Sequence, residues 1–192
     1  MTNSISIEEQ KTIRSKTAKP LLWVAMAGMT MIFASLTSAY VVRQADPDWL
    51  QFDLPSPFYL STALILLSSI TLFYADFSAK KDNQFGIKLG LGLTLFLSLA
   101  FVYSQFEAYA FMVDAGMYFS GTNISSSFLY ALTFIHLAHV FGGNIMLLVT
   151  FIQSIRNKYS SSNKLGIELA SWYWHYLTGV WIFLLLFLLY IN

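Results

Sequence analysis

The sequence contains no cysteine, and charged residues make up only 11% of its 192 positions. Without a thiol, the chain cannot form a disulfide, ligate an iron–sulfur cluster, attach a c-type haem covalently or build a thiolate copper centre. Soluble domains carry about 25% charged residues, whereas this chain is 56% hydrophobic with a mean hydropathy of +0.58. The composition therefore predicts an integral membrane protein, and nothing in it indicates nucleic-acid binding.

The few charges leave long gaps, and these gaps predict the transmembrane helices. An uncharged apolar stretch of about 18 residues or more can cross the hydrocarbon core as a helix. The segment from Gly116 to Ser127 is rich in Gly and Ser and is typical of a loop. We therefore predict an all-α membrane bundle, with a polar segment at 1–19 and one five-helix domain at 20–192. The expected helices lie at about 20–42, 57–76, 88–110, 128–152 and 169–191.

Basic residues indicate the orientation, because Lys and Arg collect in the short cytoplasmic loops of membrane proteins. Arg43 is the one basic residue that follows the first or third expected helix. The other ten precede the first helix or follow the second or fourth: Lys11, Arg14, Lys16, Lys19, Lys80, Lys81, Lys88, Arg156, Lys158 and Lys164. We therefore expect a cytoplasmic N-terminus and a periplasmic C-terminus. Segment 1–19 lacks the apolar core of a secretory signal, so we expect the first helix to be retained.

Three histidines are the candidate nitrogen ligands for a metal or a haem. His136 and His139 are three residues apart and share one helix face. The expected helices place His139 and His175 about 10 Å apart in depth, which does not favour two axial ligands on one iron. We expect no metal or cofactor in this chain, and we expect the histidines to hydrogen-bond across helices in the interior. Roles in proton transfer or lipid-headgroup binding are the alternatives.

The last two expected helices carry a specific series of aromatic, His and Gly residues. The first has Phe134, His136, His139, Val140 and Gly142, and the second has Glu168, Tyr173, Trp174, His175 and Trp181. This series resembles subunit III of the haem-copper respiratory oxidases, in the short five-helix form found in bacteria. The second expected helix is also similar to the family, with small polar residues at Thr62, Ser68, Ser69 and Thr71. Such residues also mark close helix packing.

Two departures from the family pattern concern acidic residues. The family usually has a buried Glu in the first of these helices, where Gly28 and Met29 stand here. It often has an Asp three residues after the Tyr-Trp-His motif, where this chain has Thr178. A buried intramembrane carboxylate is costly and normally functional. Its absence argues against proton exchange within the first helix.

The resemblance implies a non-catalytic accessory subunit of a proton-pumping terminal oxidase, which reduces oxygen to water. Such a subunit stabilises catalytic subunit I, supports proton uptake and binds phospholipid, while haem and copper belong to its partner subunits. Subunit II and a respiratory supercomplex are further implied partners, and the bacterial cytoplasmic (inner) membrane is the implied location. Candidate structural, lipid-binding or subunit-interface residues are His136, His139, Glu168, Trp172, Trp174, His175 and Trp181.

The tryptophans and Glu168 also have simpler explanations. Trp is enriched at membrane interfaces, so we expect only Trp181, which lies deeper, to pack against another helix. Glu168 and His175 are seven residues apart and are expected on nearly the same side of their helix. Two alternative functions stay open. One is a similar accessory protein of a nitric oxide reductase, and the other is a small transporter or channel with His136, His139 and Glu168 along a polar pathway.

Overall fold

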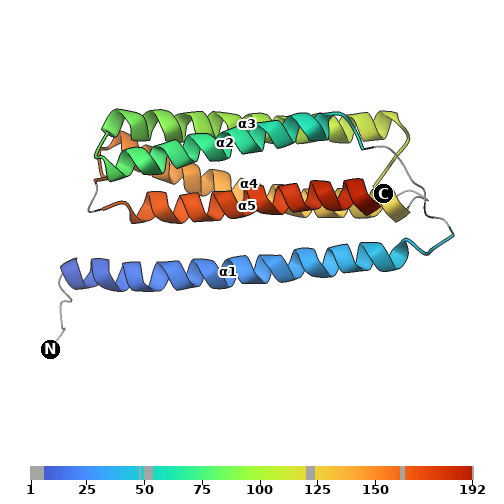
Figure 1. Ribbon diagram of the computed structural model, residues 1–192, viewed down its shortest axis with the longest axis horizontal. Coiled ribbons are helices and arrows are strands. Elements are labelled where there is room, and N and C mark those ends of the chain that lie inside the picture. The colour runs from blue at the N-terminus through green and yellow to red at the C-terminus, as the bar shows by residue number, and fades with distance from the viewer. Residues whose placement is uncertain (1–6, 48, 50–53, 120–123, 161–162, 192) are drawn as a thin grey trace.

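The computed structural model describes residues 7–47, 49, 54–119, 124–160 and 163–191, and these residues form an all-α bundle (Figure 1). Its helices are α1 (Ile7–Arg43), α2 (Pro57–Lys80), α3 (Gln84–Asp114), α4 (Ile124–Ile155) and α5 (Leu165–Ile191). All five are long and apolar enough to cross a membrane. The predicted five-helix membrane bundle is therefore confirmed. Helix α1 begins inside the polar segment 1–19, of which residues 1–6 lie outside the described part.

The connections between helices divide the bundle into two ends. One end holds the α2–α3 and α4–α5 connections and the start of α1, on the left in Figure 1. We call it the basic end, because every Lys and Arg of the sequence except Arg43 belongs to the start of α1 or to the segments around these two connections. Asp82 and Asn157 adopt positive φ values of 53° and 51° in its two connections. In each connection, the left-handed residue lets the chain reverse direction within a few residues.

Helices α2 to α5 close into a ring, and α1 lies outside it. Helices α2, α3, α4 and α5 each pack against the next, and α5 returns to pack against α2. Helix α1 contacts only α4 and α5 in the described part of the chain, and Figure 1 shows it as a separate rod beside α5. Because α5 borders α1, α2 and α4, its side chains link α1 to the ring.

Small residues bring α2 and α3 close together. A Cβ atom added at Gly90 would lie 2.8 Å from the Ala75 Cβ and 3.0 Å from the Ala75 backbone nitrogen. Farther along the same interface, the Thr71 and Thr94 hydroxyl oxygens are 2.8 Å apart. Close backbone approach through small residues and interhelical hydrogen bonds is typical of helix pairs in membranes, where lipid removes the hydrophobic driving force.

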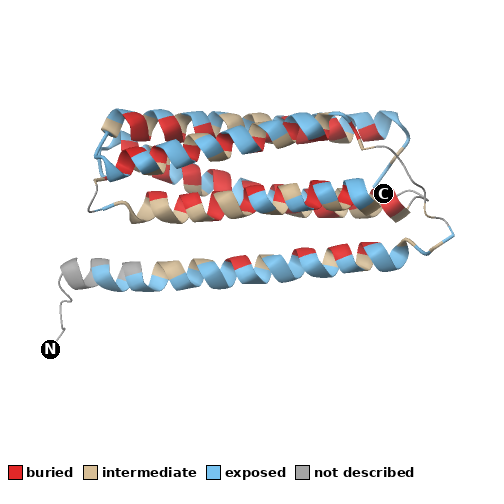
Figure 2. Cartoon of the chain, viewed as in Figure 1, coloured by how far each residue is buried: buried red, intermediate tan, exposed pale blue. Residues whose placement is uncertain are grey.

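Helix α1 buries a much narrower face than the helices of the ring do. Met26, Phe33 and Tyr40 are buried, and their spacing of seven residues places them on one line along the helix. Figure 2 shows this buried edge facing the ring, with the remaining surface of α1 mostly exposed. In a membrane, that surface must meet lipid or another protein chain.

The Gly- and Ser-rich segment before α4 is only partly a loop. Gly116 has a φ of 76° in the turn after α3, and residues 120–123 lie outside the described part. Helix α4 then begins at Ile124, so the serines expected in the loop lie in its first turn. Ser126 and Ser127 donate hydrogen bonds to the carbonyl oxygens of Tyr118 and Phe119, at 3.2 and 2.6 Å. These bonds satisfy the hydroxyls without interrupting the helix.

Candidate functional site

The candidate residues of the sequence motifs gather along α5, which presents two chemically different faces. Glu168, Trp172 and Tyr176 follow one another at intervals of four residues and point toward α1. Trp174 and Trp181 lie on the other side of α5 and are buried inside the ring of α2 to α5. The site is therefore best described as two rows of contacts, one to α1 and one to α2.

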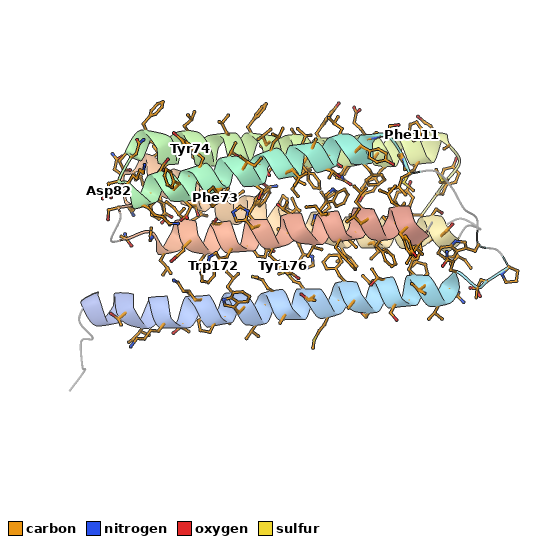
Figure 3. All side chains as sticks on the ribbon, in the orientation of Figure 1. Phe73, Tyr74, Asp82, Phe111, Trp172 and Tyr176 are labelled. Carbon is orange, nitrogen blue, oxygen red and sulfur yellow. The ribbon has the colours of Figure 1, made fainter. Side chains whose placement is uncertain are left out.

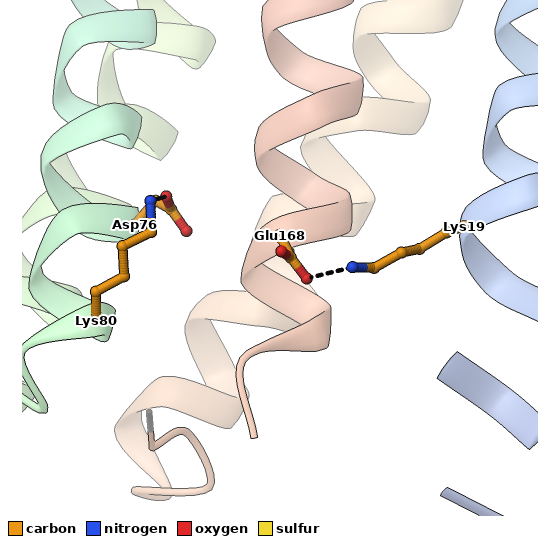
Figure 4. A network of polar contacts seen from close by, with 4 residues as sticks. All are labelled: Lys19, Asp76, Lys80 and Glu168. Atoms are coloured by element: carbon orange, nitrogen blue, oxygen red, sulfur yellow. Dashed lines mark ion pairs between the residues drawn. The ribbon is translucent and has the colours of Figure 1, made fainter. Parts of the chain in front are cut away.

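The row toward α1 begins with an ion pair at the basic end. Glu168 lies in the first turn of α5, and its Oε2 atom is 2.9 Å from the Lys19 Nζ atom of α1 (Figure 4). Lys19 Nζ also lies 5.2 Å from the centroid of the Trp172 ring, which in turn lies 5.9 Å from the Trp23 ring. One lysine thus contacts both a carboxylate and an aromatic face, two interactions that each favour a cation.

Tyr176 continues this row toward the middle of the membrane. Its hydroxyl group lies 3.0 Å from the Met26 carbonyl oxygen of α1 and 2.8 Å from the Thr30 hydroxyl oxygen. Figure 3 shows Trp172 and Tyr176 in the space between α5 and α1. Tyr176 thus bonds both a backbone group and a side-chain group of α1.

The row toward α2 consists of hydrogen bonds to small hydroxyl residues. The Trp174 indole donates to Ser68 Oγ and the Trp181 indole donates to Thr62 Oγ1, each at 2.9 Å. Between them, His175 Nδ1 lies 2.5 Å from Ser69 Oγ. An indole or imidazole in a helix bundle has no water to bond with, so these hydroxyls satisfy groups that would otherwise be costly to bury.

The three tryptophans are not placed quite as the sequence suggested. Trp181 packs in the core as expected, with its ring centroid 5.2 Å from Phe101 and 5.9 Å from Phe58. Trp174, which was expected near the membrane interface, is fully buried at 0% exposure. The physical reason is its indole nitrogen, which has an internal acceptor in Ser68. Only Trp172 remains partly exposed, near the basic end.

The two histidines of α4 differ from the expectation of cross-helix hydrogen bonds. His136 is fully buried, with Phe33, Phe101 and Trp181 ring centroids at 6.2, 6.2 and 5.1 Å. These rings come from α1, α3 and α5, and neither His136 nitrogen has a hydrogen-bond partner among the described residues. His139 bonds within its own helix, with Nδ1 2.7 Å from the Ile135 carbonyl oxygen. Of the three histidines, His175 alone is shown to bond another helix.

Glu168 and His175 contact different neighbours although they are seven residues apart. The long Glu168 side chain extends to α1, whereas His175 bonds Ser69 of α2. On α2, Asp76 forms a second ion pair, with Oδ2 2.8 Å from Lys80 Nζ, shown on the other side of α5 in Figure 4. In the described ranges, no three His, Cys, Asp or Glu side chains converge on a position where they could hold a metal ion.

Sequence comparison finds similarity to cytochrome c oxidase subunit III. The family model described as cytochrome c oxidase subunit III matches residues 48–192, which include α2, α3, α4 and α5. A probable cytochrome c oxidase subunit 3 of Rickettsia bellii is 35% identical over 141 residues, covering 71% of this chain and 47% of the relative. The chain thus spans about half the length of this relative.

Two further relatives differ in how much of their length is matched. Cytochrome c oxidase subunit 3 of Corynebacterium diphtheriae is 29% identical over 169 residues, covering 84% of this chain and 82% of the relative. The horse protein of the same name, from Equus caballus, is 31% identical over 128 residues, covering 65% of this chain and 46% of the relative. The similarity therefore extends from bacteria to a mammal, and includes one relative of comparable length.

Proposed function

Because the chain belongs to the cytochrome c oxidase subunit III family, we propose that it is a non-catalytic accessory subunit of a respiratory haem-copper oxidase. The observation that carries the proposal is the family match over residues 48–192, which spans the whole ring of α2 to α5. The hydrogen bonds of Trp174, His175 and Trp181 to α2 support a structural use of the motif. In this proposal the haem, the copper and the oxygen chemistry belong to subunits I and II, and this chain stabilises subunit I.

The proposed location is the bacterial cytoplasmic membrane, with the basic end of the bundle facing the cytoplasm. The positive-inside tendency supports this orientation, since the basic residues other than Arg43 fall at that end. It places the N-terminus in the cytoplasm and the C-terminus in the periplasm. The long match to the Corynebacterium protein supports a bacterial setting.

Support of proton uptake belongs to the same proposal, and the polar groups at the basic end are its candidates. Glu168 and Asp76 each have one carboxylate oxygen in an ion pair with a lysine. The second oxygen of Asp76 is buried and has no hydrogen-bond partner among the described residues. Carboxylates at a membrane boundary can bind protons from the aqueous side and hold them near a partner subunit.

Phospholipid binding is proposed as well, because α1 buries only one line of residues against the ring. The exposed length of α1 leaves apolar surface that lipid chains can cover. Near the basic end, Lys19, Trp23 and Trp172 combine a cation with two interfacial aromatic residues, a combination suited to headgroups.

The first test is purification through a tag on this chain in mild detergent. We expect haem a bands in the reduced-minus-oxidised spectrum, together with a large multi-span subunit identified by mass spectrometry. Co-purification of haem b with a reductase subunit would assign the chain to the nitric oxide reductase branch instead. Ion or substrate flux by the chain reconstituted alone, without a co-purifying partner, would support the transporter hypothesis.

The second test concerns the α5 residues. We expect Glu168→Ala and His175→Ala to weaken assembly or sustained turnover while leaving the oxidase haem spectrum intact, because neither residue would touch a haem. Asp114→Ala is the matched control, since it removes an exposed carboxylate at the opposite end of the bundle. Loss of a haem band in a fully assembled complex would show that the accessory role is wrong.

A further inference from the structure

A groove runs along the outside of the α2–α3 pair, at the end of the bundle opposite the basic end. It has a volume of about 550 Å³ and lies between the start of α2 and the second half of α3. It lies on α2 and α3, and among the described residues α1 contacts neither of these helices. Its occupant is therefore a separate question from the contacts of α5.

The groove changes from polar to apolar along its length. Its lining at the outer mouth includes Ser56, Tyr103 and Glu107. Leu64 of α2 and Ala100 of α3 lie about 10 Å deeper, at 1.5 Å per helical residue. A polar mouth above an apolar channel matches an amphiphile that enters from the bilayer with its headgroup at the membrane surface.

The charge at the mouth selects among headgroups. Glu107 is exposed, accepts a hydrogen bond of 2.7 Å from the Tyr103 hydroxyl, and forms no ion pair in the described part of the chain. Arg43, the one basic residue expected at this end, is paired with Asp46, with Arg43 Nη1 3.0 Å from Asp46 Oδ2. The mouth therefore presents a carboxylate without a neutralising cation, which favours an ammonium group and disfavours an anionic headgroup.

We propose that this groove binds a phospholipid with an amine headgroup, such as phosphatidylethanolamine, with its ammonium group at Glu107 and an acyl chain along Leu60, Leu64 and Ala100. The inference deepens the lipid-binding part of the proposed function by naming a site and a headgroup class. It does not depend on which oxidase subunits accompany the chain.

The test uses the full chain in nanodiscs, with whichever partner subunits it retains, and phospholipids that carry a photoreactive group on the acyl chain. Cross-links are mapped by mass spectrometry to α2 and α3 peptides around the groove. We expect an amine headgroup to give about threefold more cross-linking there than a glycerol headgroup, the size expected for one exposed charge pair. Equal yields for the two headgroups would overturn the proposal.

Three variants separate the site from general effects. Glu107→Gln should remove the headgroup preference, whereas Asp114→Asn, which removes a carboxylate seven residues further along α3, should retain it. Ala100→Phe should lower the yield for both headgroups by filling the channel. An unchanged preference in Glu107→Gln, or its equal loss in Asp114→Asn, would contradict the assignment.

A protein segment is the competing occupant, and a single thiol distinguishes it from lipid. Because the chain has no cysteine, Leu60→Cys introduces a unique attachment point for a photoreactive label. We expect this label to react with lipid. Efficient cross-linking to another polypeptide would show that a partner helix covers the groove, and would overturn the lipid site while leaving the proposed accessory function intact.

Discussion

The α2–α3 pair and helix α1 show two different ways to hold a helix in a membrane bundle. Helices α2 and α3 approach through small residues, so that Gly90 has no room for a side chain beside Ala75. Helix α1 packs through one line of large residues, and an ion pair, a hydroxyl group and aromatic rings add contacts to α4 and α5. Since packing rather than hydrophobicity holds membrane helices together, α1 should be the helix held least tightly.

Helix α1 also differs from the ring in its match to the family model. The family model matches from residue 48, so the matched residues include the ring and not α1. Helix α1 keeps most of its surface exposed, whereas α5 is buried against three neighbours. The ring is therefore the more deeply buried of the two regions.

The largest difference is expected between two tryptophans of α5. Trp174 faces α2 and is fully buried, and Trp172 faces α1 and is partly exposed. Trp174→Ala should lower the free energy of unfolding by about 3 to 5 kcal/mol, because it leaves a cavity and removes the indole N–H that donates to Ser68 Oγ. Trp172→Ala should cost about 1 kcal/mol, the size of an exposed cation–π contact. Reversible unfolding in mixed detergent micelles measures both.

A third variant separates the cavity from the hydrogen bond. Trp174→Phe retains most of the ring volume but removes the indole N–H that donates to Ser68. We expect a loss between those of the two alanine variants. Equal losses for Trp172→Ala and Trp174→Ala would contradict the distinction between the faces of α5.

Replacing a glycine by a large residue tests how closely each region is packed, in the α2–α3 pair and in α1. Gly90→Leu must push α2 away from α3, because the nearest Ala75 atoms include backbone that cannot move aside. We expect a loss of about 1 to 3 kcal/mol, or failure to accumulate in the membrane. Gly28→Leu is the matched control in α1, since a Cβ atom there would have nothing within 4 Å. Similar losses at both positions would show that α1 is packed more tightly than its contacts indicate.

A smaller effect is expected from the hydrogen bond between α2 and α5. Ser69→Ala removes the hydroxyl partner of His175 Nδ1 and leaves the imidazole nitrogen without its acceptor or donor. We expect a loss of about 1 kcal/mol, as is typical of interhelical hydrogen bonds in membranes. Ser35→Ala in α1 should cost less, because the exposed Ser35 hydroxyl bonds its own helix. The same unfolding measurement compares the two.

The number of helices could be predicted from charge spacing and one Gly- and Ser-rich segment, because a membrane tolerates few charges within a span. The helix ends could not. Charged and polar residues mark where the hydrocarbon begins, but the helices continue past it, as in α1 from Ile7 and α3 to Asp114. The serines before α4 suggested a loop by composition, yet the carbonyl groups of Tyr118 and Phe119 satisfy two of them within the helix.

Side-chain partners were harder to predict than helix faces. The spacing of Glu168 and His175 indicated one side of α5, but the length of the Glu168 side chain takes it to α1. The hydroxyl residues Thr62 and Ser68 were visible in the sequence as small polar residues of an apolar helix. That they accept from Trp181 and Trp174 depends on α2 lying next to α5, and the order of helices around the ring is not encoded in periodicity.

The smallest expected effect is that of the ion pair between α1 and α5. Lys19 and Glu168 are both partly exposed, so water and headgroups compete with their attraction. A double-mutant cycle with Lys19→Met and Glu168→Gln should give a coupling energy of about 0.5 kcal/mol, within the range of exposed pairs. Asp76→Asn combined with Lys19→Met is the control cycle, because Asp76 pairs with Lys80 instead, and its coupling should be near zero.

A coupling energy above about 2 kcal/mol would show that the Lys19–Glu168 pair is not exposed to water in the membrane. Exposed pairs do not reach that value, and pairs removed from water can. It would mean that lipid or a partner subunit covers the Lys19–Glu168 pair in the membrane, in agreement with the proposed role of this end of α5 as an interface. Repeating the cycle in high salt distinguishes the two cases, because salt screens an exposed pair much more than a covered one.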